Sequence, residues 1–402
     1  MRRITVVGGG LAGLTAAIAA AEAGAVVTLH EAHHSLGGRA RTAPAPHRVN
    51  EGPHAFYAGG PHWSWLKKRG LAGPLAHLSP LEAARLRFHR DGRLRRVPPA
   101  AMIRLLRAKR APVDADFTTW ATGVVGAAGA RAAANYVGVA TFHHAPGELS
   151  AAFVQERFRR SAKVPPEARY VRGGWGAVVE RMADHAWKLG VRLETGSRVD
   201  TLPTDQGPVI VATALPTART LLGDASLTWD SGRTVLVDLA VRTRRGDAFA
   251  VSDLDSPGWV ERFTAQDPSL APPGEQLLQG QVPIGPDETR ADGLARAEHL
   301  LDLGFPGWRE RTVFRRVALA TGRTGAVDAP GTTWRDRPAI HRGDGVYLAG
   351  DQVAAPGVLC EVSFNSALTA VTLALGGRAG DGASVTAVTP GHGSTPLDLN
   401  FG

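Results

Sequence analysis

Three glycines near the start of the chain have the spacing of a phosphate-binding turn. Gly8, Gly10 and Gly13 follow the apolar run 4–7 and precede a segment rich in Ala and Leu that ends at Gly24. In such a turn the first glycine allows a sharp bend, the second lets backbone approach a pyrophosphate, and the third lets a helix pack on a strand. The N–H groups and dipole at the helix start favour the negative charge of phosphate. The pattern predicts a dinucleotide site.

Glu31 strengthens this prediction. It ends the apolar run 26–29, which is predicted to be the second strand, and it lies 18 residues beyond Gly13. A carboxylate at this place can accept hydrogen bonds from both ribose hydroxyls of an adenosine. The alternative is a glycine-rich turn in an ordinary strand–helix–strand unit, and the turn by itself does not distinguish NAD from FAD.

A second glycine pair, Gly37-Gly38, is followed by Arg39 and begins six residues past Glu31. Together the motifs resemble the glutathione-reductase-type FAD-binding group, in particular the flavin amine oxidase and phytoene desaturase superfamily. The resemblance implies non-covalent FAD in contact with Gly8, Gly10, Leu11, Ala12, Gly13, Glu31, Ala32, Gly38, Arg39 and Ala40.

The far end of the chain carries a matching pattern. Gly350 and Asp351 follow a short apolar strand, and the run 356–359 opens a segment of helical composition. The resemblance implies that Asp351 holds the phosphate and ribityl region and that the helix start faces the flavin pyrimidine. The expected contacts are Gly350, Asp351, Gly357, Val358 and Leu359. Cys360 lies at the expected flavin edge, where a covalent link is conceivable, although no other signal indicates one.

The segment 49–57 resembles a stretch that passes close to the flavin ring in this superfamily. Gly52, Pro53 and His54 are therefore expected to contact FAD, and the resemblance places Val199 near the adenine. His54 is the one candidate catalytic residue, because an imidazole can carry a proton near neutral pH. A structural histidine packed against the ring is the alternative that we favour.

The chain of 402 residues is long enough for about two domains. We expect an α/β fold in which a Rossmann-like FAD-binding domain (1–80, 165–230 and 325–385) receives an inserted substrate domain (81–164 and 231–324). The inserted part should contain an antiparallel sheet, from runs such as 234–242, and helices. The resemblance implies that the apolar face of this sheet lies over the flavin. Residues 386–402 are rich in Gly, Ser, Thr and Pro and are predicted to be a disordered tail.

The composition indicates in which compartment the protein is expected and which partners it is expected to bind. No apolar run reaches the ~18 residues of a membrane span, the first strand leaves no room for a signal peptide, and one cysteine fits a reducing compartment. A cytoplasmic protein is expected. The net charge of +9 comes mostly from arginine, since only five of the 46 basic residues are lysine. That bias is typical of a GC-rich coding background, and no basic stripe or motif indicates a nucleic-acid partner.

Two further site classes receive little support. The basic segment 100–110 is predicted to be an amphipathic helix, which could make a weak contact with a membrane surface or simply present a solvated basic face. No metal site is predicted, because the adjacent pairs His33-His34 and His143-His144 are poorly placed to chelate one ion. The oligomeric state is not indicated.

The expected reaction is removal of a hydride equivalent from a C–H bond of a small apolar or secondary-metabolite substrate, as in a desaturase. An FAD-dependent amine oxidase is the first alternative. It is disfavoured because the resemblance leads us to expect a lysine on the substrate sheet, and the chain has none after Lys188. A redox-neutral isomerase with reduced FAD is another alternative, and a non-catalytic binding protein is a remote one.

Overall fold

The computed structural model describes residues 2–52 and 55–377. The predictions for Pro53, His54 and the tail 386–402 fall outside these residues. The first layer is a parallel five-stranded sheet in the order β14-β8-β1-β2-β7. Its strands are β1 (Arg3–Val7), β2 (Val26–Glu31), β7 (Arg192–Thr195), β8 (Val209–Val211) and β14 (Val346–Leu348).

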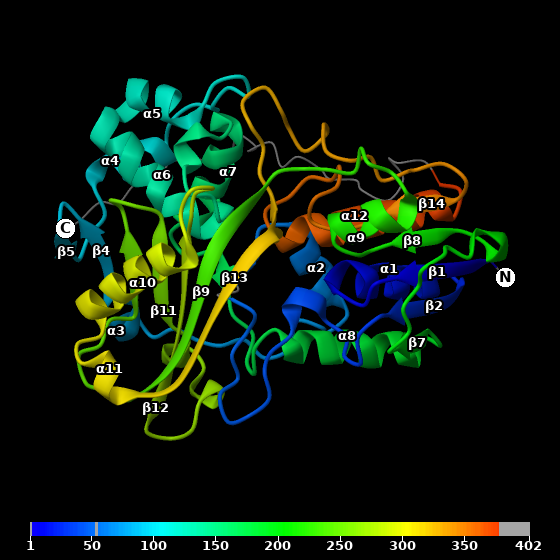
Figure 1. Cartoon of the computed structure of the whole chain (residues 1–402), viewed down its shortest axis with the longest axis horizontal. Coiled ribbons are helices and arrows are strands. Elements are labelled where there is room, and N and C mark those ends of the chain that lie inside the picture. Colours follow the sequence, from blue (N-terminus) through cyan, green and yellow to red (C-terminus); the bar gives the residue numbers. More distant parts are fainter. Residues whose placement is uncertain (1, 53–54, 378–402) are drawn as a thin grey trace, which may run out of the picture.

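Helices from distant parts of the chain gather around this sheet (Figure 1). They are α1 (Leu11–Glu22), α8 (Gly176–Lys188), α9 (Leu215–Leu222) and α12 (Cys360–Ala374). Helix α1 packs against both α8 and α12, and the three share one hydrophobic core with the sheet. The central strand β1 is buried on both sides, which explains its run of β-branched residues.

The second layer is a seven-stranded sheet in the order β13-β9-β12-β11-β10-β4-β5. All its pairings are antiparallel except that between β4 and β10. Its strands are β4 (Leu86–Arg90), β5 (Arg93–Arg95), β9 (Ser231–Arg242), β10 (Ala250–Asp253), β11 (Gly258–Arg262), β12 (Glu275–Pro283) and β13 (Thr312–Ala326). The turn between β4 and β5 has Asp91 at φ 52° and Gly92 at φ 66°, the left-handed pair that a two-residue hairpin favours.

A helical lobe lies beside this sheet, and its apolar core also takes in Phe88 of β4, Leu254 and Val327. It consists of α4 (Ala100–Leu106), α5 (Phe117–Val125), α6 (Ala127–Thr141) and α7 (Ala151–Ser161). Short elements join the lobe and sheets: α2 (Pro61–Lys68), α3 (Pro80–Ala83), β3 (Phe56–Tyr57) and β6 (Ala168–Arg169). Within the described ranges no helix has the length and apolar character needed to cross a membrane.

The expected orientation of the seven-stranded sheet was wrong. Its apolar face packs against α10 (Arg290–Gly304), with α11 (Trp308–Arg311) beside it, and not over the cofactor region. Val235, Val237 and Val260 lie on this covered face with Leu300 of α10. The expectation failed because the sequence analysis did not predict α10. Without this helix, the cofactor region was the only layer available to cover the apolar face of the sheet.

The α/β fold is confirmed, with a Rossmann-like sheet and a second, mainly antiparallel sheet with helices. Every strand of the parallel sheet comes from the segments predicted to bind FAD, and the seven-stranded sheet comes from those predicted to bind substrate. Strand β13 runs two residues past the expected boundary at 324. The domain boundaries themselves stay a prediction.

Candidate dinucleotide site and adjoining cavity

A cavity of about 1770 Å³ extends from the β1–α1 turn to the helical lobe. At one end its wall contains the glycine turn, the end of β2 and the segment 38–41. At the other end it reaches Met102 and Ile103 of α4 and Phe142 after α6. One continuous space therefore joins the predicted cofactor site to the predicted substrate side.

The glycine turn leaves room where a diphosphate would lie. Gly8 has φ +107°, and a Cβ on Gly13 would lie 1.8 Å from the Gly8 carbonyl oxygen, so neither position tolerates a side chain. Gly10 differs, because a Cβ there would meet nothing closer than the Gly37 oxygen at 3.9 Å and would project at the cavity wall. As N-cap of α1, Gly10 has no side chain that could satisfy the first N–H groups of the helix. These features fit an anionic diphosphate.

Glu31 lies at the same end of the cavity with its carboxylate already oriented. Its Oε2 accepts a hydrogen bond from the Gly9 amide at 2.7 Å, and its Oε1 accepts one from the His33 amide at 2.9 Å. A carboxylate has about four acceptor positions, so two stay available for the hydroxyls of a ribose.

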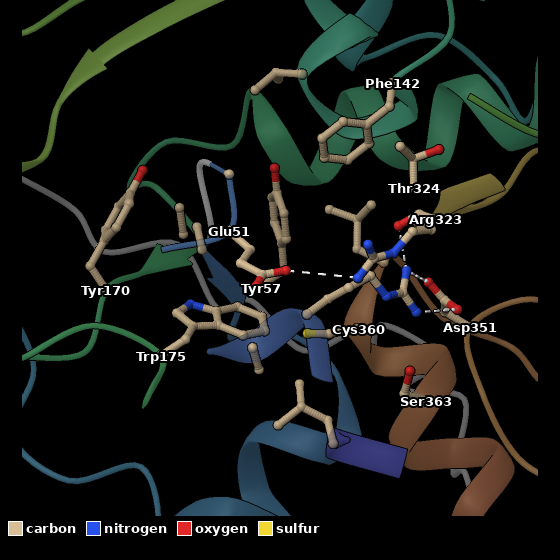
Figure 2. Close-up of a pocket in the computed structure, with 18 of the residues that line it drawn as sticks. Glu51, Tyr57, Phe142, Tyr170, Trp175, Arg323, Thr324, Asp351, Cys360 and Ser363 are labelled. Atoms are coloured by element: carbon tan, nitrogen blue, oxygen red, sulfur yellow. Dashed lines mark hydrogen bonds and ion pairs between the residues drawn. The ribbon is translucent and has the colours of Figure 1, made fainter. Parts of the chain in front are cut away.

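Arg39 and Asp351 come from opposite ends of the chain and meet at the cavity wall. The guanidinium donates two parallel hydrogen bonds to the carboxylate, at 2.7 and 2.8 Å (Figure 2). Burial acts to raise the pKa of Asp351, but the charge and hydrogen bonds of Arg39 outweigh it and leave the pKa lowered. Arg41 and Arg323 both pair with Glu51 nearby, at 3.0 and 3.8 Å. This concentration of guanidinium groups suits a cofactor that carries phosphate.

Most of the predicted cofactor contacts lie together on the cavity wall. They are Gly8, Gly10, Leu11, Ala12, Glu31, Ala32, Gly38, Arg39, Ala40, Gly52, Val199, Gly350, Asp351 and Leu359. Three others lie behind the wall: Gly13, Gly357 and Val358. A Cβ on Gly357 would lie 2.6 Å from Cγ of Glu361, so this glycine is needed for packing at the start of α12.

Of the three residues expected at the start of α12, only Leu359 lines the cavity, and it adopts φ 56°, which is strained for a leucine. Cys360 and Ser363 line the cavity beside it (Figure 2). Burial raises the pKa of the Cys360 thiol well above its usual range. The thiol is therefore neutral and a weak nucleophile. Non-covalent binding of the cofactor stays a prediction.

Aromatic side chains that the sequence did not single out line the middle of the cavity. Tyr57, Tyr170 and Trp175 face this space from separate segments (Figure 2). The Trp175 ring stacks on Phe56 at 4.2 Å between centroids, which fixes its orientation. Burial raises the pKa of Tyr57, so its hydroxyl stays protonated. Tyr57 ends the segment 49–57 that was expected near the flavin ring, but no role was predicted for its side chain, and none was predicted for Tyr170 or Trp175.

Arg160 of α7 holds the lobe against the start of α12. It forms ion pairs with Glu167 and Glu361 and donates a hydrogen bond to the Tyr57 carbonyl at 3.1 Å. Burial acts to raise the pKa of Glu361, but the nearby His62 and Arg160 lower it to about 2. The cluster therefore fixes one wall of the cavity through buried charge.

A protein-family model for an NAD(P)-binding Rossmann-like domain matches residues 6–68. No curated protein matches the chain by sequence. Among solved structures, an oxidoreductase from Methanosarcina mazei has a TM-score of 0.72 at 18% identity, with 91% of this chain and 98% of the other covered. The chain shares the fold of this oxidoreductase. Reduced UDP-galactopyranose mutase has a TM-score of 0.66 at 14% identity, with 94% of this chain and 96% of the mutase covered. Putrescine oxidase bound to putrescine has a TM-score of 0.67 at 16% identity, with 93% of this chain and 98% of the oxidase covered.

Proposed function

We propose that the protein is an FAD-dependent oxidoreductase that removes a hydride equivalent from a C–H bond of a small apolar or secondary-metabolite substrate. FAD would supply the hydride acceptor, and the protein would supply orientation and a pocket shielded from water. The observation that carries the proposal is the continuous cavity, which begins at a diphosphate-fitting turn and ends among apolar side chains.

The chain's own residues would divide the binding between them. The first turn of α1 would face the diphosphate, Glu31 would accept the ribose hydroxyls, and the Arg39–Asp351 pair would border the ribityl region. On the substrate side, Met102 and Phe142 supply apolar contact. The neutral hydroxyl of Tyr57 can donate a hydrogen bond there.

Amine oxidation and redox-neutral chemistry are the competing functions, and the solved structures with this fold include both a putrescine oxidase and a mutase. The absence of any lysine after Lys188 still favours a desaturase-like reaction. We also propose a small-molecule partner and no nucleic acid. The case for a membrane contact through α4 is weaker, because Met102 and Leu105 are buried, which leaves Ile103 as the one large apolar side chain of this helix that is exposed.

The cofactor part is tested by two matched glycine variants. Gly10→Ala adds a methyl group at the cavity wall, so the protein should fold with unchanged stability and retain much less FAD. Gly123→Ala in α5 adds the same methyl group where nothing lies within 4 Å and should retain FAD fully. Equal flavin content in both variants would show that the diphosphate does not pass Gly10.

The visible spectrum of the purified protein, before and after acid precipitation, tests the mode of binding. Flavin bands that move to the supernatant are expected for non-covalent FAD. A colourless protein that also fails to take up added FAD would overturn the proposed function.

A further inference from the structure

Glu261 lies in the cavity wall on strand β11. Side chains alternate along this strand, so Val260 packs on the covered face with α10, while Trp259 and Glu261 face the cavity. The register pairs Glu261 with Gln279 of β12 and Ala250 of β10, which fixes it in the interior of the sheet. The carboxylate is thus held on the cavity side by two neighbouring strands.

Three neutral groups orient this carboxylate. Its Oε1 accepts from Gln266 Nε2 at 2.6 Å, and its Oε2 accepts from Trp259 Nε1 at 3.0 Å and from the Tyr170 hydroxyl at 3.2 Å. Within the described ranges no lysine, arginine or histidine is the hydrogen-bond or ion-pair partner of Glu261, whose contacts are all with neutral groups. Arg169 lines the same cavity but donates to the carbonyls of its own segment.

A buried carboxylate without a counter-ion is unfavourable unless something else offsets its charge. Glu261 is only 2% exposed, and burial raises its pKa to about 7. Three donors leave one of its roughly four acceptor positions unused. The wall around it is aromatic, with Tyr170, Trp259 and Phe263 beside it, and ring faces attract cations in desolvated sites.

We infer that Glu261 recognises a protonated nitrogen on an otherwise apolar substrate. The inference rests on the proposed function for the identity of the site and names the substrate class. The cation would take the unused acceptor position of the carboxylate and lie against the aromatic wall, while the apolar part extends toward α4. Glu261 is a recognition residue here, and the inference does not depend on which C–H bond is oxidised.

The test is calorimetric titration of the FAD-loaded protein with tert-octylamine at about pH 8.5, where an amine is protonated and Glu261 is ionised. This amine has no hydrogen on the carbon next to nitrogen, so it binds without oxidation of that bond. The alcohol of the same carbon skeleton is the neutral probe. Glu261→Gln keeps the shape of the side chain, and Glu298→Gln on α10, away from the cavity, is the control with the same chemical change.

Glu261→Gln should weaken the binding of tert-octylamine by about tenfold or more and change the affinity for the alcohol by no more than about twofold, because only the charge-assisted contact is lost. Glu298→Gln should change neither. Unchanged amine affinity in Glu261→Gln overturns the inference, and so does an equal loss for amine and alcohol, which would indicate altered packing. A protein that takes up no FAD refutes the proposed function instead, and the same titration on that protein still reports on Glu261.

Discussion

The buried carboxylate of Glu261 makes the stability of the protein depend on pH in a direction that can be worked out. Burial raises its pKa from 4.5 to about 7 in the folded protein. In the unfolded chain the group is solvated and titrates near its ordinary value. Between these two values the folded protein binds more protons than the unfolded chain, so its free energy of unfolding falls as pH rises through this range.

The magnitude follows from the size of the shift. One pKa unit corresponds to about 1.36 kcal/mol, so a shift of this size amounts to about 3 kcal/mol once both states are ionised. At about pH 5 most of this loss in the free energy of unfolding has not yet occurred. Between about pH 5 and 8.5 the free energy of unfolding should therefore fall by about 2.5 kcal/mol. Water in the cavity would reduce the effect, so this figure is an upper value.

Glu261→Gln removes the titration and leaves most other groups untouched. The variant loses part of the hydrogen bonding to Tyr170, Trp259 and Gln266 at every pH, which is a constant offset of about 1–3 kcal/mol. We therefore compare the difference in free energy of unfolding between wild type and variant, from urea titrations across this pH range with FAD in excess. As pH rises from about 5 to about 8.5, the free energy of unfolding of the wild type should fall relative to that of the variant by up to about 2.5 kcal/mol.

Glu180→Gln on α8 provides the control, because this exposed carboxylate forms no ion pair within the described residues and should give a difference that does not vary with pH. If the Glu261→Gln difference is equally flat, the carboxylate is solvated or paired with a cation in the folded protein. That result would refute the burial argument and remove the main support for cation recognition.

Three further variants test other parts of the structure. Arg160→Met should lower the free energy of unfolding by about 3–5 kcal/mol in urea titrations, because it removes the guanidinium shared by two buried carboxylates and leaves Glu167 with Lys163 at 3.7 Å and Glu361 with His62 at 3.8 Å; adding Glu361→Gln should recover part of this loss, and no recovery would contradict the assigned pairing. Gly13→Ala should fail to fold, since its Cβ would lie 1.8 Å from the Gly8 oxygen; a soluble variant with native circular dichroism would show that the turn can relax. Cys360→Ser should keep normal flavin content and release it on acid precipitation, whereas loss of acid-stable flavin in the variant alone would reveal a covalent link.

The parts of the site that sequence could predict are those set by local backbone geometry. A positive φ at Gly8 and the lack of space at Gly13 are requirements within one turn, so residue type and spacing reveal them. Glu31 at the end of β2 follows from the same short unit. Gly357 also needs its small size, but for packing against Glu361, so its place behind the wall could not be read from the motif.

The substrate side depends on pairings between distant segments, and there the sequence was less informative. The cavity position of Glu261 results from the register of β11 with β10 and β12, which no local pattern specifies. Helix α10 did carry a usable signal, because Thr289 and Asp292 form a capping box at its start. Recognition of this helix would have assigned the apolar sheet face to it and left the opposite face, which carries Leu236, Trp259 and Glu261, for the cavity.

The cluster at Arg160 bears on how the chain can be divided. One guanidinium joins α7, the strand residue Tyr57 and the start of α12, which lie far apart in sequence. An excised helical lobe, α4 to α7, would carry Arg160 but would lose both Glu167 and Glu361, and the remainder would keep these two buried acids without its guanidinium. Chimaeras that exchange this lobe with another protein should therefore exchange the Glu361 position as well, because the charge of Glu361 is balanced by Arg160 of the lobe.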